Sequence, residues 1–143
     1  MIAVDSNVIL NVLRKNDPIE QQNESIRFFE HIQNSGTRIA LSAISVTEVL
    51  RLPFRANSVE QQKTVHDFLR AISAVVIPIE RNAAIAAASL IEEKKMQFAD
   101  ALIAASVLQA GIKIFVTRNT SDFKRSGLEI CTPEEYMKKY GQN

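Results

Sequence analysis

The chain has 143 residues, 46% of them hydrophobic, with 4 glycines, 4 prolines and a net charge of +1. This length fits a single domain over residues 1–143 that buries a substantial core, and the composition excludes a linker or a disordered tail. The charge balance excludes a protein that coats nucleic acid by bulk charge, but it is compatible with a local basic patch.

Apolar runs typical of buried strands alternate with helical patterns from one end of the chain to the other. The expected strands are residues 1–4, 37–42, 75–79, 112–116 and 128–131. The expected helices are a first one from Val8, then residues 20–34, 45–52, 58–73, 81–94 and 100–110, and a last one from Pro133. A polar and basic loop is expected over residues 117–126. Alternation of this kind favours a parallel α/β sheet.

Cysteine usage and hydropathy bear on the compartment. A single cysteine, Cys131, cannot form an internal disulfide, and its apolar neighbours are typical of a buried side chain. No segment approaches the roughly 18 consecutive apolar residues of a membrane helix. The N-terminus also lacks the basic region and apolar core of a signal peptide. We therefore expect a cytoplasmic, reducing setting and no membrane partner.

The first strand ends at an acid, Asp5, and a helical pattern begins directly after it. A buried parallel strand would deliver Asp5 to its carboxyl end, where open α/β sheets bind their ligands. The alternative is that Asp5 only caps the next helix by accepting hydrogen bonds from backbone amides. For Asp5 taken alone, capping is the default interpretation.

Three more acids stand at comparable junctions, and each has a local structural alternative. Glu48 follows Ser45 by three residues, which is the spacing of a capping box. Asp100 begins an apolar helix, and the positive end of the helix dipole stabilises a carboxylate at that position. Asp122 lies in the loop after the fourth strand, where it can pair at the surface with a basic residue of the same loop.

The four acids together indicate a metal site. Parallel topology places the first and fourth strand ends, and the helices that begin beside them, around one crevice. Carboxylates crowded there repel one another unless a cation holds them together. Oxygen ligands with abundant water suit Mg²⁺ or Mn²⁺ rather than zinc. Such an ion orients a phosphodiester and lowers the pKa of a bound water, so the pattern indicates divalent-cation phosphoryl hydrolysis.

Other chemistries fit the chain less well. His31 and His66 lie in amphipathic helical patterns without a serine or cysteine elbow, and no Walker A or glycine-rich dinucleotide loop is present. A phosphatase that uses the strand-end aspartate as nucleophile, in the manner of the haloacid dehalogenases, needs a second aspartate where this chain has Asn7.

Four parts of the sequence, taken in order, also match a known pattern. They are Val4-Asp5-Ser6-Asn7-Val8, the helix-borne Glu48, Phe98-Ala99-Asp100-Ala101-Leu102-Ile103-Ala104-Ala105, and Val116-Thr117-Arg118-Asn119-Thr120-Ser121-Asp122-Phe123. In these parts the chain resembles the PIN-domain ribonucleases, and within them the VapC-like toxins of prokaryotic toxin–antitoxin pairs. The resemblance implies an α/β/α sandwich with a four- or five-stranded parallel sheet. It also implies Mg²⁺- or Mn²⁺-dependent endonucleolytic cleavage of single-stranded RNA.

The resemblance implies a role for each acid. Asp5 and Asp100 would be the direct metal ligands, and Glu48 and Asp122 would bind a second ion or hold metal-bound water. Asn7 would fix Asp5 by a hydrogen bond. The site would be lined by two further residues, Thr117 and Asn119.

Three features of the chain qualify the resemblance. Ser6 stands where threonine is commoner in the family, which keeps the hydroxyl. Asn119 stands where some relatives have another acid, which weakens the case for a second metal ion. The stretch 58–80 varies between relatives and is a candidate for shaping substrate choice.

The resemblance also implies partners. VapC-like proteins pair as homodimers, and an antitoxin lays a basic, amphipathic segment into a groove near the acids. The helices near the N-terminus carry more apolar residues than one core-facing stripe obviously needs: Leu10, Leu13, Phe28, Phe29, Leu50, Leu52 and Phe54. The basic residues around Asp122 are candidates for RNA binding, or for a solvated loop surface: Arg118, Lys124 and Arg125.

Two other functions stay open on the sequence. One is a PIN-type nuclease in RNA processing that has no antitoxin, which an adjacent small antitoxin gene would argue against. The other is a catalytically silent PIN-like module that binds RNA or protein, and the presence of all four acids argues against it.

Overall fold

The computed structural model describes residues 1–14 and 18–141, and its centre is a five-stranded sheet. The strands are β1 (Ile2–Val4), β2 (Ile39–Ser42), β3 (Val75–Ile77), β4 (Ile114–Val116) and β5 (Glu129–Cys131). They lie in the order β3-β2-β1-β4-β5, and every neighbouring pair is parallel. The expected parallel α/β fold is therefore confirmed, with five strands.

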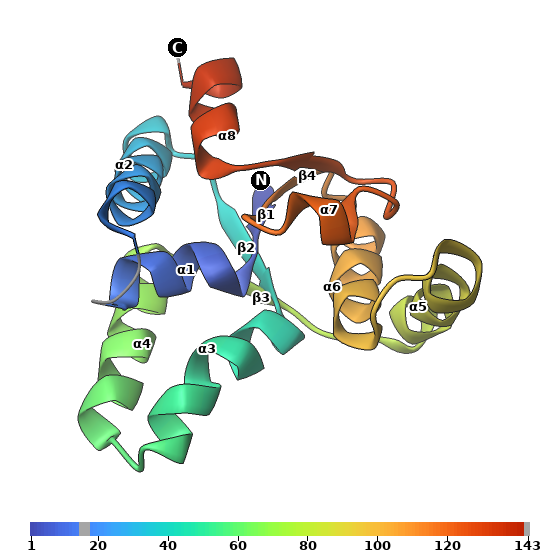
Figure 1. Cartoon of the computed structure of the whole chain (residues 1–143), viewed down its shortest axis with the longest axis horizontal. Helices are drawn as coiled ribbons and strands as arrows, with labels where there is room; N and C mark the ends of the chain where they lie inside the picture. Colours follow the sequence, from blue (N-terminus) through green and yellow to red (C-terminus); the bar gives the residue numbers. More distant parts are fainter. Residues whose placement is uncertain (15–17, 142–143) are drawn as a thin grey trace.

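Helices cover both faces of this sheet. They are α1 (Ser6–Leu13), α2 (Ile19–Ser35), α3 (Ala43–Arg55), α4 (Val59–Ala71), α5 (Arg81–Lys94), α6 (Phe98–Gln109), α7 (Thr120–Phe123) and α8 (Pro133–Tyr140). Figure 1 shows α1, α2, α4 and α8 on one side of the sheet, and α5, α6 and α7 on the other. Among the described residues, no helix is both long and apolar enough to cross a membrane.

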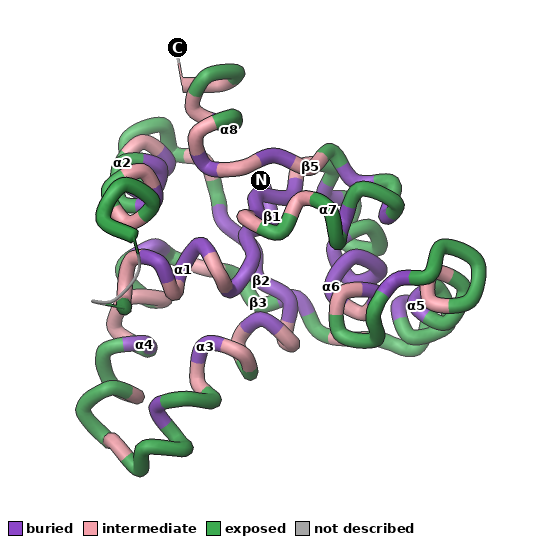
Figure 2. The backbone as a smooth tube through the Cα atoms, in the orientation of Figure 1, coloured by how far each residue is buried: buried purple, intermediate pink, exposed green. Residues whose placement is uncertain are grey.

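The strands read as continuous apolar runs because both of their faces are buried. Ile2 and Val4 contribute to the core under α1, α2 and α8, whereas Ala3 between them contributes to the core under α5 and α6. This alternation is the two-residue period of a strand. The centre of the molecule is accordingly buried, and the exposed surface lies mainly on the outer helices (Figure 2).

The strand order places the switch point of the sheet at β1. β2 and then β3 lie on one side of β1, whereas β4 and then β5 lie on its other side. Ligands of open parallel sheets bind beyond the carboxyl ends of the strands at which the order reverses. Here those strands are β1 and β4, which end at Val4 and Val116.

Both expected boundaries of the third helix are wrong in an informative way. The third helix begins at Ala43 rather than at Ser45, because the hydroxyl of Ser42 accepts the Ile44 amide at 3.3 Å and caps it. This helix also continues through Pro53 to Arg55. A proline so close to the end of a helix removes one hydrogen bond of the last turns and leaves the preceding turns intact.

The expected loop 117–126 contains a short helix, α7. Its sequence is polar except for Phe123, which is 1% exposed and packs on Phe115 of β4 with 4.7 Å between ring centroids. Burial of this ring folds the loop back onto the sheet, and so holds Asp122 near the end of β4. The sixth helix likewise begins two residues earlier than expected, so Asp100 is its third residue.

Candidate active site

Asp5 stands at the switch point of the sheet. It follows β1 directly, its backbone amide donates to the Val116 carbonyl at 2.9 Å, and it is 4% exposed. One carboxylate oxygen, Oδ1, accepts the Ser6 amide at 2.8 Å. The other, Oδ2, accepts the Thr117 hydroxyl at 2.6 Å and the Asn7 side-chain amide at 3.1 Å. Asp5 therefore caps α1 and also joins a network between β1 and β4, so the two interpretations of this residue are compatible.

Thr117 and Asn7 fix the orientation of the Asp5 carboxylate. Thr117 follows β4 as Asp5 follows β1, and it is completely buried. The Asn7 side chain donates to the Thr117 hydroxyl at 3.2 Å and accepts the Arg118 amide at 3.2 Å. The Asn119 amide donates to the same hydroxyl at 3.0 Å. The structure thus brings three of the expected supporting residues to Asp5, although Asn119 contributes its backbone to these bonds.

Glu48 faces the same crevice from α3. Because the cap of this helix is Ser42, Glu48 lies in the helix interior and the expected capping box with Ser45 is wrong. Its Oε1 atom is buried and has no hydrogen-bond partner among the described residues. A buried carboxylate oxygen without a partner costs free energy, so its position calls for a ligand that the protein itself does not supply.

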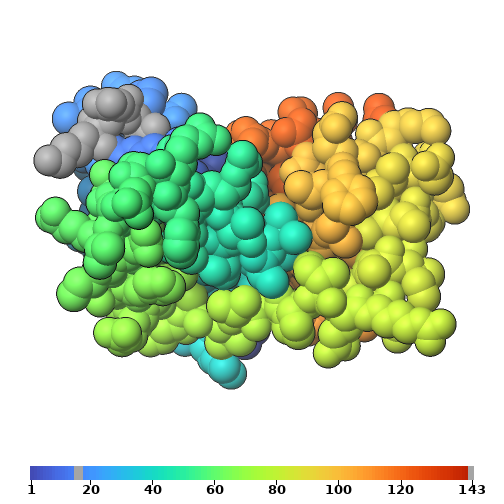
Figure 3. Space-filling view, turned by 90° about the horizontal axis from the view of Figure 1, so that it is seen from below, coloured from blue at the N-terminus to red at the C-terminus, as the bar shows by residue number. Residues whose placement is uncertain are grey.

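The other two acids come from α6 and α7. Asp100 is half-buried and Asp122 is exposed, and both line one pocket of about 300 Å³. Figure 3 shows α6, in orange, beside α3, in cyan, and the two helices are in contact. The ion pairs of the described residues do not include Asp122, so the pairing expected for a surface loop acid is absent there.

The four carboxylates act on one another electrostatically. Burial raises the pKa of Asp5 above its ordinary value, and the charge of Asp122 adds to this, although hydrogen bonds from Thr117 and Ser6 oppose it. Burial also raises the pKa of Glu48, with the charges of Asp5 and Asp100 adding to the effect. Burial, Asp122 and Asp5 together raise the pKa of Asp100 to about 6. The structure therefore brings all four acids into one field of like charge.

A divalent cation fits this donor set. It would offset the mutual repulsion of the acids and give the unpartnered Glu48 oxygen a positive charge to bind, directly or through water. No group of three or more His, Cys, Asp or Glu side chains in the described part of the chain stands ready to hold an ion. Mg²⁺ is usually bound by one or two carboxylates together with water and substrate phosphate, so two direct ligands suffice.

Arg118 lies beside the site but does not face it. Its Nη1 donates to Glu134 of α8 at 2.7 Å, and its Nη2 donates to the Gln21 carbonyl at 2.9 Å and to the Ser25 hydroxyl at 3.0 Å, both in α2. Its Nε donates to Asn11 of α1. The side chain is only 13% exposed. Its donors are engaged inside the protein, so we no longer count Arg118 among the RNA-binding candidates, which leaves Lys124 and Arg125.

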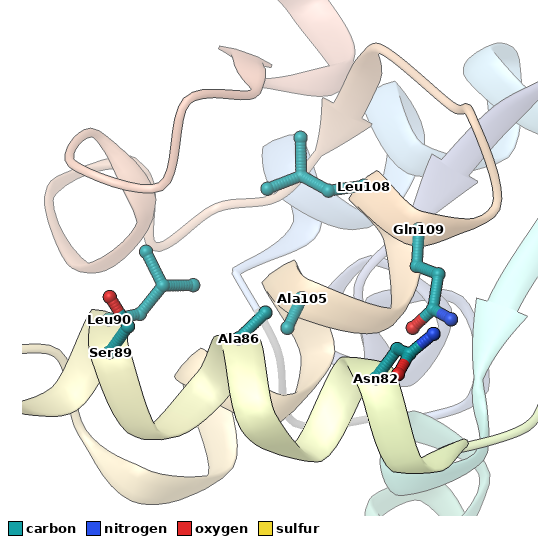
Figure 4. A pocket seen from close by; sticks show the side chains of 7 residues that line it. All are labelled: Asn82, Ala86, Ser89, Leu90, Ala105, Leu108 and Gln109. Carbon is teal, nitrogen blue, oxygen red and sulfur yellow. The ribbon is translucent and has the colours of Figure 1, made fainter.

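A second pocket contains none of the acids. It is a groove of about 520 Å³ between α5 and α6, lined mostly by small and apolar side chains: Asn82, Ala86, Ser89, Leu90, Ala105, Leu108 and Gln109 (Figure 4). Ala86 and Ala105 face each other across the groove and let the helices approach closely. The groove is lined by no titratable side chain.

The sequence matches the family model described as PIN domain over residues 2–127. The chain belongs to the PIN-domain family. Among curated proteins there is no match. The family assignment therefore rests on most of the chain, including all four acids.

Solved structures resemble this PIN domain along almost its whole length. A toxin–antitoxin complex from Klebsiella pneumoniae shares 23% identity at a TM-score of 0.67, covering 93% of this chain and 98% of that one. FitAcB from Neisseria gonorrhoeae shares 21% identity at a TM-score of 0.71, covering 94% of this chain and 99% of that one. VapBC2 from Rickettsia felis, bound to a DNA fragment from its promoter, shares 21% identity at a TM-score of 0.69, covering 92% of this chain and 98% of that one. Likenesses at these identities establish the fold.

The sequence assigned no role to Ser6, and it assigned Arg118 to RNA binding rather than to the contacts that the structure shows. The Ser6 hydroxyl donates to Asp5 Oδ1 at 3.4 Å, and the polar Ser6 side chain also lies close enough to Glu48 to lower the pKa of that carboxyl. Ser6 thus lies between two acids from different elements. The sequence feature that could have indicated this role of Ser6 is its place between Asp5 and Asn7. Arg118 gave no such signal, because its partners come from three helices distant in sequence.

Proposed function

We propose that this PIN domain is a Mg²⁺- or Mn²⁺-dependent endoribonuclease that cleaves single-stranded RNA. The observation that carries the proposal is the convergence of four carboxylates, one of them with a buried unpartnered oxygen, at the switch point of the sheet. PIN domains are generally nucleases, which supports the same conclusion.

Each acid has a proposed part in this reaction. Asp5 and Asp100 bind the metal ion, and Glu48 and Asp122 hold water at the ion or a second ion. When bound, the ion polarises the phosphodiester and makes a water nucleophilic near neutral pH. Thr117 and Asn7 hold the Asp5 carboxylate in one orientation through their hydrogen bonds. Lys124 and Arg125, exposed beside Asp122, are the proposed contacts to RNA phosphates.

Glu48 gives the experiment that tests the proposal. Because Glu48 is not a helix cap, Glu48→Gln should unfold at or above the parental temperature. Cleavage of a labelled single-stranded RNA in Mg²⁺ should fall about 10- to 100-fold, as for residues that orient a metal site. EDTA should stop the parent. Glu93→Gln, an exposed acid of α5, is the matched control and should cleave like the parent. Parental cleavage by Glu48→Gln would remove Glu48 from the site.

The raised pKa values predict how Mg²⁺ affects stability. The pKa of Asp100 is 3.8 in the unfolded chain and about 6 in the folded chain. Between these two pH values the folded chain therefore holds the Asp100 proton more tightly than the unfolded chain. The contribution of Asp100 to the free energy of unfolding therefore falls as the pH rises through that window. Mg²⁺ offsets the charge that then develops. The rise in melting temperature on adding Mg²⁺ should be larger at about pH 7.5 than at about pH 5. Equal rises at both pH values would contradict binding at these acids.

We also propose that the chain is the toxin of a toxin–antitoxin pair and forms a homodimer. One of its structural neighbours is described as a toxin–antitoxin complex, which supports an antitoxin partner. The family resemblance adds that this partner would carry a basic, amphipathic segment. Of the apolar residues that suggested a groove, Phe28 and Phe29 belong to the core, so they form no groove. Leu52 and Phe54 on α3 are 41% and 62% exposed, and remain candidates for such a contact. Light scattering and co-purification with the product of the neighbouring gene test these two partners.

A further inference from the structure

A pocket with basic walls opens beside two of the four acids. It has a volume of about 300 Å³ and lies between the end of α5 and α7, with Asp100 and Asp122 in its lining. Its other walls carry four basic side chains, two from each segment: Lys94, Lys95, Lys124 and Arg125. The Arg125 guanidinium donates to the Lys94 carbonyl at 3.3 Å, which ties the two segments together.

These four basic groups are available to an anion. In the described part of the chain the ion pairs involve other residues, so no carboxylate neutralises the four cations directly. Lys95 also adopts a left-handed conformation with φ of 57° at the end of α5. Glycine takes that conformation with less strain, so a lysine there accepts a local cost while it places a cation at the pocket. Four cations close together attract phosphate and repel one another without it.

An exposed aromatic residue directly follows one of the lining residues of this pocket in the chain. Phe98 is the first residue of α6, two residues before Asp100, and it directly follows the lining residue Gln97. Phe98 is 72% exposed, and it belongs to neither hydrophobic core of the described residues. Sites for single-stranded nucleic acid combine a basic channel for the backbone with aromatic side chains on which bases stack. The pocket and Phe98 together have both components.

We propose that this pocket is the subsite for the nucleotide next to the scissile phosphate. Lys94, Lys95, Lys124 and Arg125 bind its phosphate backbone, and Phe98 stacks on its base. The inference rests on the proposed ribonuclease function, and it adds residues from the end of α5 and the start of α6 to the substrate contacts. It gives the RNA one path away from the acids, between α5 and α7.

Binding of a fluorescent single-stranded RNA pool, of about 20 nucleotides and random sequence, tests the subsite. Anisotropy is measured in the Asp5→Asn background with Mg²⁺, so that the RNA stays intact while the pocket is unchanged. The pair Lys94→Ala and Lys95→Ala should lower the slope of log affinity against log salt by about 1.4, or about 0.7 for each lost phosphate contact. Phe98→Leu should weaken binding about tenfold, whereas Phe98→Trp should bind like the parent.

A matched control removes the same charge from the opposite edge of the sheet. Arg38 precedes β2 and Lys113 precedes β4, and both are exposed, so their double alanine variant should keep the parental slope. A parental slope in the Lys94 and Lys95 variant overturns the subsite, as does parental affinity in Phe98→Leu, because an apolar contact survives that change and a stack does not.

The unsubstituted chain is assayed for cleavage of the same RNA, which separates the two proposals. If it does not cut while the pocket variants lose affinity, the nuclease proposal fails, and the pocket is an RNA-binding site without a scissile phosphate beside it. If it cuts and the pocket variants bind like the parent, the subsite fails and the nuclease proposal stands.

Discussion

Asp5→Asn and Asp100→Asn are each expected to abolish RNA cleavage, with a loss of at least about 10³-fold, while the protein stays folded. Each change removes a charge that the metal ion would bind and replaces it with an amide of nearly the same shape. The pKa values of Asp5 and Asp100 are raised because burial penalises their charged forms. Removing either charge therefore relieves a cost in the metal-free protein.

The stability of the two variants separates loss of chemistry from loss of fold. Asp100→Asn should melt above the parent in EDTA. Asp5→Asn also removes a buried charge, but its new amide group faces two donors, the Thr117 hydroxyl and the Asn7 side-chain amide, so this variant should stay folded and melt below Asp100→Asn. Asp67→Asn, at an exposed acid paired with Lys63, is the control and should cleave like the parent. A purified, folded Asp100→Asn that cleaves at the parental rate would contradict the assignment of the metal ligands.

Arg118→Met is expected to give the largest loss of stability among the variants considered, about 2–4 kcal/mol. The change leaves Asn11, Ser25 and the Gln21 carbonyl without their charged donor, and it leaves Glu134 unpaired. Glu134 is 39% exposed and can turn toward water, so the loss is smaller than for a fully buried pair. Burial raises the pKa of Glu134, but hydrogen bonds, above all from Arg118, outweigh this and hold it below its ordinary value.

The same variant should also reduce cleavage, because Arg118 holds the segment between Thr117 and Asp122 against three helices.

Lys124→Met is the control for stability: it removes an exposed cation of the same loop and should shift the free energy of unfolding by less than about 0.5 kcal/mol. Adding Glu134→Met to Arg118→Met should restore part of the lost stability, since an apolar pair replaces an unpaired charge. Urea unfolding of the four proteins measures these differences. A parental midpoint for Arg118→Met would show that its hydrogen bonds contribute nothing.

The sequence predicted the parts of the site that depend on strand ends. Asp5 and Thr117 follow two buried strands, and parallel pairing of those strands brings their side chains within 2.6 Å. The apolar helical pattern predicted Asp100 at the start of a helix, and Asp100 is the third residue of α6. This inference works because the carboxyl edge of a parallel sheet is determined by topology alone, without knowledge of side-chain packing.

Local patterns were less informative where tertiary contacts decide. Ser45 and Glu48 have the spacing of a capping box, but Ser42 at the end of β2 caps the helix instead, so the spacing was coincidental. Burial of Phe123 folds a polar segment into α7. The partners of Arg118 come from distant parts of the chain, so no short-range pattern marks it. In each case a contact between distant residues overrode the local preference.

In the proposed reaction, a metal ion held by Asp5 and Asp100 would supply an activated water as the nucleophile. Water would form a bond to phosphorus as the P–O bond to the leaving nucleotide breaks, and the RNA 2′-hydroxyl would take no part. The most direct measurement is to map the ends of the RNA fragments that the purified chain produces in Mg²⁺. The account predicts one phosphomonoester end and one hydroxyl end, no 2′,3′-cyclic phosphate, continued cleavage when the nucleotide at the cut lacks its 2′-hydroxyl, and no cleavage in EDTA. Cyclic phosphate ends, or undiminished cleavage in EDTA, would contradict it.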